Sequence, residues 1–126
     1  MKVISVVVVV LFLVAGLAVG EQKGKICVAT KEKSSEAAVS DKAGLAPYFL
    51  IFDEKGKLIE AITNPYKEAK NPGPTVADFL AGKGATVVVA EGFGPKIIEV
   101  MKGKGIKAVS FKGSAEEAVR KVLQAN

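Results

Sequence analysis

Apolar positions along the chain form several short runs, separated by polar segments that contain glycine or proline. Residues 26–29 and 86–90 are apolar at almost every position, which is typical of strands covered on both faces. Residues 47–53 are rich in aromatic and β-branched side chains, and Gly56 marks a hairpin turn before residues 58–63. The sequence therefore predicts five strands, at residues 25–30, 47–53, 58–63, 86–90 and 106–110.

Three further segments have the apolar spacing of helices. The first covers residues 75–81, after a break at residues 71–74 that contains two prolines. The second begins at Pro95, and the third begins at Ser114, which forms a capping box with Glu117. The positions expected to face the core are Val76, Phe79, Leu80, Ile97, Ile98, Met101, Ala118, Val119 and Val122.

The order of these elements, β-β-β-α-β-α-β-α, predicts a single α/β domain. A hairpin followed by right-handed helical crossovers implies a mixed sheet with helices on both faces. If the first strand pairs with the second and the second with the third, the first crossover carries the fourth strand to the free side of the first. The expected strand order is 3-2-1-4-5, with only strand 2 antiparallel.

The N-terminal segment differs from the rest of the chain. One lysine is followed by an uncharged, apolar stretch from residue 3 to residue 20, and small residues, Ala18 and Gly20, precede Glu21. This pattern predicts a signal peptide at residues 1–20, an exported protein (periplasmic or extracellular), a linker at 21–24 and a domain at 25–126. An uncleaved membrane anchor is the main alternative, because eighteen helical residues reach roughly 27 Å. A buried core strand is the third.

Composition excludes several kinds of chemistry. The chain has 126 residues, no histidine and one cysteine, Cys27, so a Ser-His-Asp triad, a histidine metal site and an internal disulfide are impossible. Cys27 falls inside an apolar strand and is expected to be structural. The net charge of +5 is spread along the chain, so we expect no nucleic-acid partner, and membrane contact only through the leader.

One place in the expected fold favours a ligand. The long polar loop at residues 31–46 and the turn at residues 91–96 meet beyond strands 1 and 4, where the strand order reverses. Gly92 and Gly94 let a ligand approach the backbone, the helix that starts at Pro95 points its N–H groups outward, and Lys96 adds positive charge. A plain β-to-α turn with closely packed glycines is the alternative.

Other candidates are weaker. Four carboxylates, Glu32, Glu36, Asp41 and Glu91, do not have the spacing of a cation-binding loop. No nucleophile is paired with a base, so the sequence predicts a protein that is not an enzyme.

Three segments resemble a known family: residues 40–53, the pair Asn64-Pro65, and residues 87–96. Together they are similar to the dinitrogenase iron–molybdenum cofactor biosynthesis family, the nitrogenase accessory factor domain, and the resemblance extends from about Lys25 to Leu123. It implies a ribonuclease H-like three-layer α/β/α fold with strand order 3-2-1-4-5. It also implies non-catalytic binding or carriage of the iron–molybdenum cofactor or its iron–sulfur precursor.

The chain departs from the usual family motif, Ser-x-His-Phe-Gly-Arg-Ala-Pro-x-Phe. Lys42 stands at the position of the histidine, Ala43 at that of the phenylalanine and Leu45 at that of the arginine, and a further histidine is replaced near Asn71. The motif residues that are retained are Ser40, Gly44, Ala46, Pro47 and Phe49. The fold is therefore expected to carry over, whereas the identity of the cofactor stays open.

The leading hypothesis is an exported, non-catalytic domain that holds a small anionic or metal-containing ligand between strands 1 and 4. Lys42 would attract an anion where the family has a histidine. A scaffold or protein-interaction domain that kept the fold and lost the site is the main alternative, and an uncharacterised enzyme is a third. The residues expected to contact the ligand are Thr30, Ser40, Lys42, Gly44, Glu91, Gly92, Phe93, Gly94 and Lys96.

Overall fold

A computed structural model describes residues 24–125, and the leader expected at residues 1–20 lies outside the described residues. The strands are β1 (Lys25–Thr30), β2 (Tyr48–Phe52), β3 (Leu58–Thr63), β4 (Ala85–Ala90) and β5 (Lys107–Ser110). The helices are α2 (Pro72–Gly82), α3 (Pro95–Gly103) and α4 (Ala115–Gln124). No helix among the described residues is both long and apolar enough to cross a membrane.

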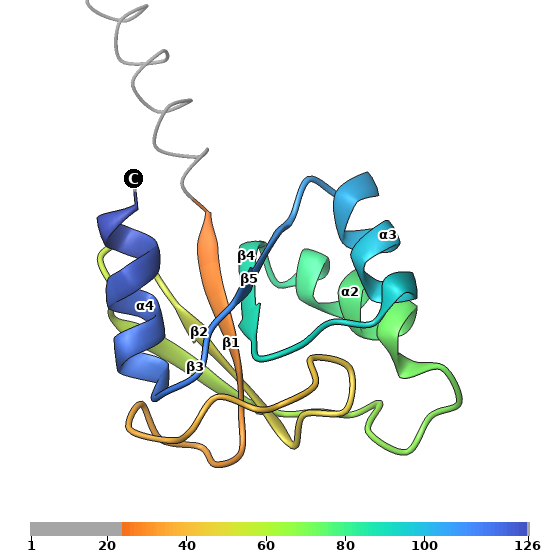
Figure 1. The fold of residues 1–126 in the computed structure, drawn as a ribbon, viewed down its shortest axis with the longest axis horizontal. Coiled ribbons are helices and arrows are strands. Elements are labelled where there is room, and N and C mark those ends of the chain that lie inside the picture. Colours follow the sequence, from red (N-terminus) through yellow and green to blue (C-terminus); the bar gives the residue numbers. More distant parts are fainter. Residues whose placement is uncertain (1–23, 126) are drawn as a thin grey trace, which may run out of the picture.

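The five strands form one mixed sheet in the order β3-β2-β1-β4-β5, which confirms the prediction. β2 pairs antiparallel with both β1 and β3, whereas β1, β4 and β5 run parallel to one another. The strand order therefore reverses between β1 and β4 (Figure 1). The chain places β2 and β3 on one side of β1, and then β4 and β5 on the other side.

Two cores cover the two faces of this sheet. Side chains alternate along a strand, so Cys27 and Ala29 pack toward α2 and α3, whereas Ile26 and Val28 pack toward α4. Figure 1 shows the resulting three layers, with α4 on one side of the sheet and α2 and α3 on the other. All four of these β1 residues are buried, which explains why the strand reads as a continuous apolar run.

Helix α2 begins earlier than the sequence predicts. The break expected at residues 71–74 is instead the start of the helix, with Asn71 as the N-cap residue and prolines in the first turn. Proline fits there because the first N–H groups of a helix have no partner within it. Phe79 is only half-buried, and its ring meets Tyr66 edge-on at 5.5 Å between centroids.

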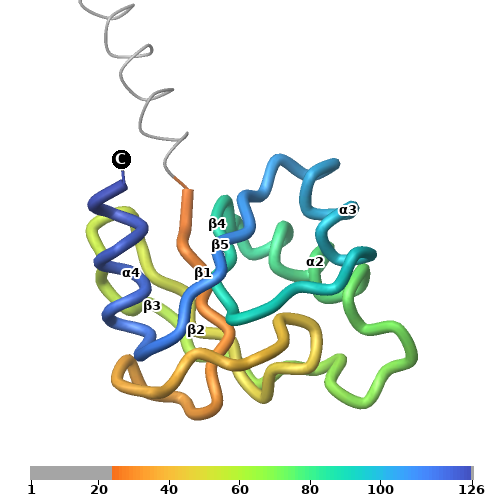
Figure 2. Tube along the Cα trace, viewed as in Figure 1, coloured from red at the N-terminus to blue at the C-terminus, as the bar shows by residue number. Residues whose placement is uncertain are grey.

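The long segment after β1 is packed onto the fold. Val39 is fully buried, and its N–H donates to the Gly113 carbonyl at 2.8 Å. The Ser40 N–H donates to the Ala29 carbonyl at 2.7 Å. These bonds hold the segment across the carboxyl ends of the strands, at the end of the molecule opposite the two described termini (Figure 2).

Candidate ligand-binding site

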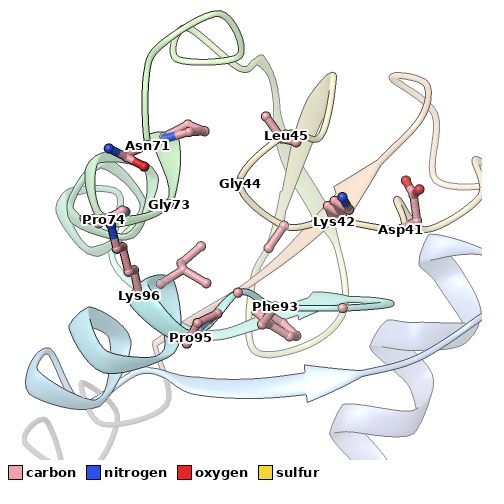
Figure 3. Close-up of a pocket in the computed structure, with 15 residues that line it drawn as sticks. Asp41, Lys42, Gly44, Leu45, Asn71, Gly73, Pro74, Phe93, Pro95 and Lys96 are labelled. Atoms are coloured by element: carbon pink, nitrogen blue, oxygen red, sulfur yellow. The ribbon is translucent and has the colours of Figure 1, made fainter.

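A pocket of about 560 Å³ opens beyond the carboxyl ends of β1 and β4 (Figure 3). Three segments line it: residues 41–45 after β1, residues 71–74 at the start of α2, and residues 92–97 between β4 and α3. This is the place where the strand order reverses, which is where open α/β sheets bind their ligands.

Backbone hydrogen bonds join the first and third of these segments. The Ala43 N–H donates to the Gly92 carbonyl at 3.1 Å, and the Glu91 N–H donates to the Ser40 carbonyl at 2.9 Å. A Cβ on Gly92 would lie 3.2 Å from the Asp41 carbonyl oxygen, so glycine is what permits this approach. The floor of the pocket is therefore a fixed piece of backbone.

The second segment meets the first through a pair of glycines, Gly44 and Gly73. A Cβ on Gly44 would lie 3.3 Å from both the backbone nitrogen and the Cα of Gly73. Asn64, which is buried, fixes the same loop, because its side-chain amide donates to the carbonyls of Gly44 at 3.2 Å and Ala46 at 2.9 Å. These hydrogen bonds give Asn64, from the Asn64-Pro65 pair, a structural role at the site.

Two helices point their N-termini at the pocket. α2 starts there at Pro72 and α3 starts there at Pro95, and neither N-cap residue accepts a side-chain hydrogen bond from its helix. The N-terminus of a helix carries a partial positive charge and N–H groups that have no partner within the helix. The pocket is thus electropositive before any side chain is counted.

Charged side chains add to this potential. Lys42 and Lys96 are exposed and lie on opposite sides of the pocket in Figure 3, and Asp41 is the one acidic residue of its lining. Apolar groups such as Phe93 and the half-exposed Leu45 form much of the remaining wall. The arrangement suits a compact anion held by backbone N–H groups and lysines.

Metal ligands are scarce around this pocket. Its lining holds no cysteine, and within residues 24–125 there is no cluster of three or more His, Cys, Asp or Glu side chains that could hold a metal ion. Cys27 is fully buried in the core between the sheet and the α2–α3 layer, and burial raises the pKa of its thiol. At neutral pH the thiol is therefore protonated and packed inside the sheet.

Most of the residues expected from the sequence meet at this pocket. Those that line it are Lys42, Gly44, Gly92, Phe93, Gly94 and Lys96. Thr30, Ser40 and Glu91 are not part of the lining. The Thr30 hydroxyl donates to the Glu32 carbonyl at 2.6 Å and the Ser40 hydroxyl to the Lys42 carbonyl at 3.3 Å, so both shape the loop.

The start of α2 was not predicted from the sequence as part of the site. Residues 71–74 form one of the three segments that line the pocket, but the sequence was interpreted there as a break between elements. The signal was present, because proline at the first helical positions marks a helix N-terminus.

Comparison with known proteins places this geometry in a family. Residues 24–125 match the family described as "Dinitrogenase iron-molybdenum cofactor". No curated protein matches the chain.

Solved structures share the fold. A Thermotoga protein assigned as NifB is 27% identical, with a TM-score of 0.69 over 80% of this chain and 88% of that one. The apo form of the orange protein from Desulfovibrio gigas is 24% identical, with a TM-score of 0.75 over 80% and 88%. A Methanocaldococcus jannaschii protein assigned as a dinitrogenase is 10% identical, with a TM-score of 0.58 over 81% and 89%.

Proposed function

The chain belongs to the dinitrogenase iron–molybdenum cofactor family, and from this premise we propose that it binds a small anion or anionic metal complex in the pocket between β1 and β4. The domain acts as a binding or carrier module and catalyses no reaction. With its apolar leader, it works outside the cytoplasm, or on the membrane if the leader is retained.

One observation carries the proposal: two helix N-termini and two lysines converge on a single pocket whose lining has one acidic residue. Each exposed helix N-terminus stabilises a nearby negative charge by about 0.3–1 kcal/mol, and more where water is excluded. Lys42 and Lys96 reach the ligand from different segments, so they can neutralise two sides of it.

The residues present do not fit a coordinated iron–sulfur or iron–molybdenum cluster. Such clusters are held by thiolate or imidazole ligands, whereas the chain has no histidine and its one cysteine is buried in the core. They do fit a complete anion held by hydrogen bonds and charge, because neither interaction requires a bond to a metal. Any metal would therefore arrive inside its own anionic complex.

Gly94 offers a clean test of the pocket. A Cβ added there would meet no protein atom within 4 Å, and the backbone has φ of −74° and ψ of 160°, which valine adopts readily. Gly94→Val should therefore leave the fold intact and obstruct the pocket. Gly103→Val is the matched control, because Gly103 ends the same helix, lies outside the pocket lining and also has open space at its Cβ.

The measurement is a titration with molybdate, phosphate and sulfate, followed by the NMR shifts of the Gly92 and Gly94 amides and by calorimetry. We expect saturable shifts of both amides in the native chain and in Gly103→Val, and no shift of the Gly92 amide in Gly94→Val. Lys42→Ala should weaken binding by less than Gly94→Val. If no oxyanion moves these amides at millimolar concentration, the chain is better described as a scaffold that kept the fold and lost the site.

A further inference from the structure

The end of the domain opposite the pocket gathers lysines from five separate segments. It is built from the start of β1, the β2–β3 turn, the ends of α2 and α3, and the start of β5, because these elements all begin or end on that side. Its lysines are Lys25, Lys55, Lys57, Lys83, Lys102, Lys104 and Lys107. We call this surface the basic end.

Acidic residues only partly neutralise the basic end. Asp53, Glu54, Glu60 and Asp78 lie on the same elements. Glu60 pairs with Lys83 at 3.2 Å and Asp78 with Lys104 at 3.3 Å, and no ion pair is found for the other five lysines within residues 24–125. Six of the seven lysines are exposed, and Lys83 is half-buried.

The pocket end shows no such excess. Residues 31–42, 67–70, 91–96 and 112–117 hold seven lysines and seven acidic residues, so their charges cancel. With seven lysines and four acidic residues the basic end carries a net charge of +3, whereas the pocket end carries none, although both ends hold the same number of lysines. β1 alone separates the two ends by roughly 20 Å, which is about two screening lengths at 0.1 M salt.

The N-terminal segment joins the fold at the basic end. Lys25 begins β1, and its N–H donates to the carbonyl of Gly84, which lies between α2 and β4. Only four residues separate Lys25 from the apolar leader expected at residues 1–20. The segment that we expect to contact the membrane during export or anchoring thus leads directly into the basic end of the domain.

We propose that the basic end docks on an anionic lipid bilayer and holds the domain with its pocket facing away from the membrane. The sequence indicated membrane contact through the leader alone, whereas the fold supplies a second contact. Anionic headgroups attract basic residues within about a screening length of the surface. A nucleic acid fits less well, because the basic end has no fully exposed aromatic side chain on which bases could stack.

The test uses a chain that starts at Glu21, so that the leader does not contribute. Both buried cores lie between Ile26 and Val122, and such a chain keeps all of the residues that form them. Binding is measured by co-sedimentation with phosphatidylcholine vesicles that contain either no anionic lipid or about 30% phosphatidylglycerol, at about 0.1 M salt.

Two triple variants with the same net charge distinguish an effect of the basic end from an effect of the net charge of the domain. The first carries Lys55→Gln, Lys102→Gln and Lys107→Gln at the basic end. The control carries Lys31→Gln, Lys67→Gln and Lys112→Gln at the pocket end, all exposed and outside the pocket lining. Each lysine near an anionic surface contributes about fivefold to partitioning, so the first triple should bind about 100-fold more weakly.

We expect the native chain and the control triple to bind the anionic vesicles and to ignore the neutral ones. Equal losses in the two triples would overturn the proposal, because they would mean that net charge alone matters. So would binding to a single-stranded oligonucleotide but not to anionic vesicles, or no binding to either. Neither triple variant changes a residue that lines the pocket. Oxyanion binding in the pocket can therefore be measured independently of vesicle binding.

Discussion

Cys27 makes the stability of the domain measurable with a thiol reagent. It lies on the central strand, between Ile51 of β2 and Val88 of β4, and its side chain is fully buried. Burial also raises the pKa of its thiol, so the reactive thiolate is absent from the folded protein at neutral pH. We therefore expect labelling to require opening of the sheet at its centre.

The expected protection follows from domain size. A chain of this length has an unfolding free energy of about 5–15 kcal/mol, and 1.4 kcal/mol is tenfold in an equilibrium constant. Even an unfolding free energy of about 5 kcal/mol makes labelling of Cys27 several thousandfold slower than in the unfolded chain. An anion that binds only the folded state, at about 100 times its Kd, slows labelling by a further factor of about 100.

The assay follows colour release from an aromatic disulfide reagent in increasing urea, with and without molybdate. Lys112→Cys adds an exposed thiol to the same chain as an internal reference, because Lys112 is exposed and outside the pocket. The reference thiol should react at once and be insensitive to urea. If Cys27 reacted as fast as the reference in native buffer, the account of the central strand would be wrong.

Three further results are expected. Ser114→Ala should lower the free energy of unfolding by about 1 kcal/mol in urea denaturation, because the Ser114 hydroxyl accepts the Glu117 N–H at 3.2 Å in a capping box; a change below the error would contradict the assigned cap. Gly44→Val should loosen the pocket, since its Cβ would press on the Gly73 backbone at 3.3 Å; unchanged oxyanion affinity would argue against that contact. The thermal midpoint should fall as pH drops through the carboxylate range. Hydrogen bonds from backbone N–H groups lower the pKa of Asp53, chiefly from Lys57, and the pKa of Glu117, from Ser114. The resulting stabilisation is present above the ordinary pKa of each carboxyl group and is lost once the group is protonated. Asp53→Asn should lessen this pH dependence, and an unchanged profile would refute the role given to Asp53.

The order of strands was determined by sequence alone. Apolar runs identified the buried strands, Gly56 marked the hairpin, and the handedness of crossovers left one arrangement, 3-2-1-4-5. These signals are local in the chain, so they do not depend on tertiary contacts. The capping box at Ser114 was readable for the same reason, because its two partners are three residues apart.

The set of residues that line the pocket could be identified only from the tertiary structure. The first turn of α2 faces Gly44 across the chain, and this close approach depends on glycines that are 29 residues apart in sequence. Likewise Asn64 acts on carbonyls 18 and 20 residues away. No periodicity encodes such pairs, so residues 71–74 could be recognised as a break but not as a wall of the site.

The distribution of charge shows the same division. In the sequence the lysines are scattered along the whole chain, which indicates only a solvated surface. In the fold, parallel strands and the helices that return between them bring their like ends together, so lysines from five segments meet at one end while acidic residues balance those at the other. Sequence determined how many charges the domain carries, and the direction of each strand and helix decided where they gather.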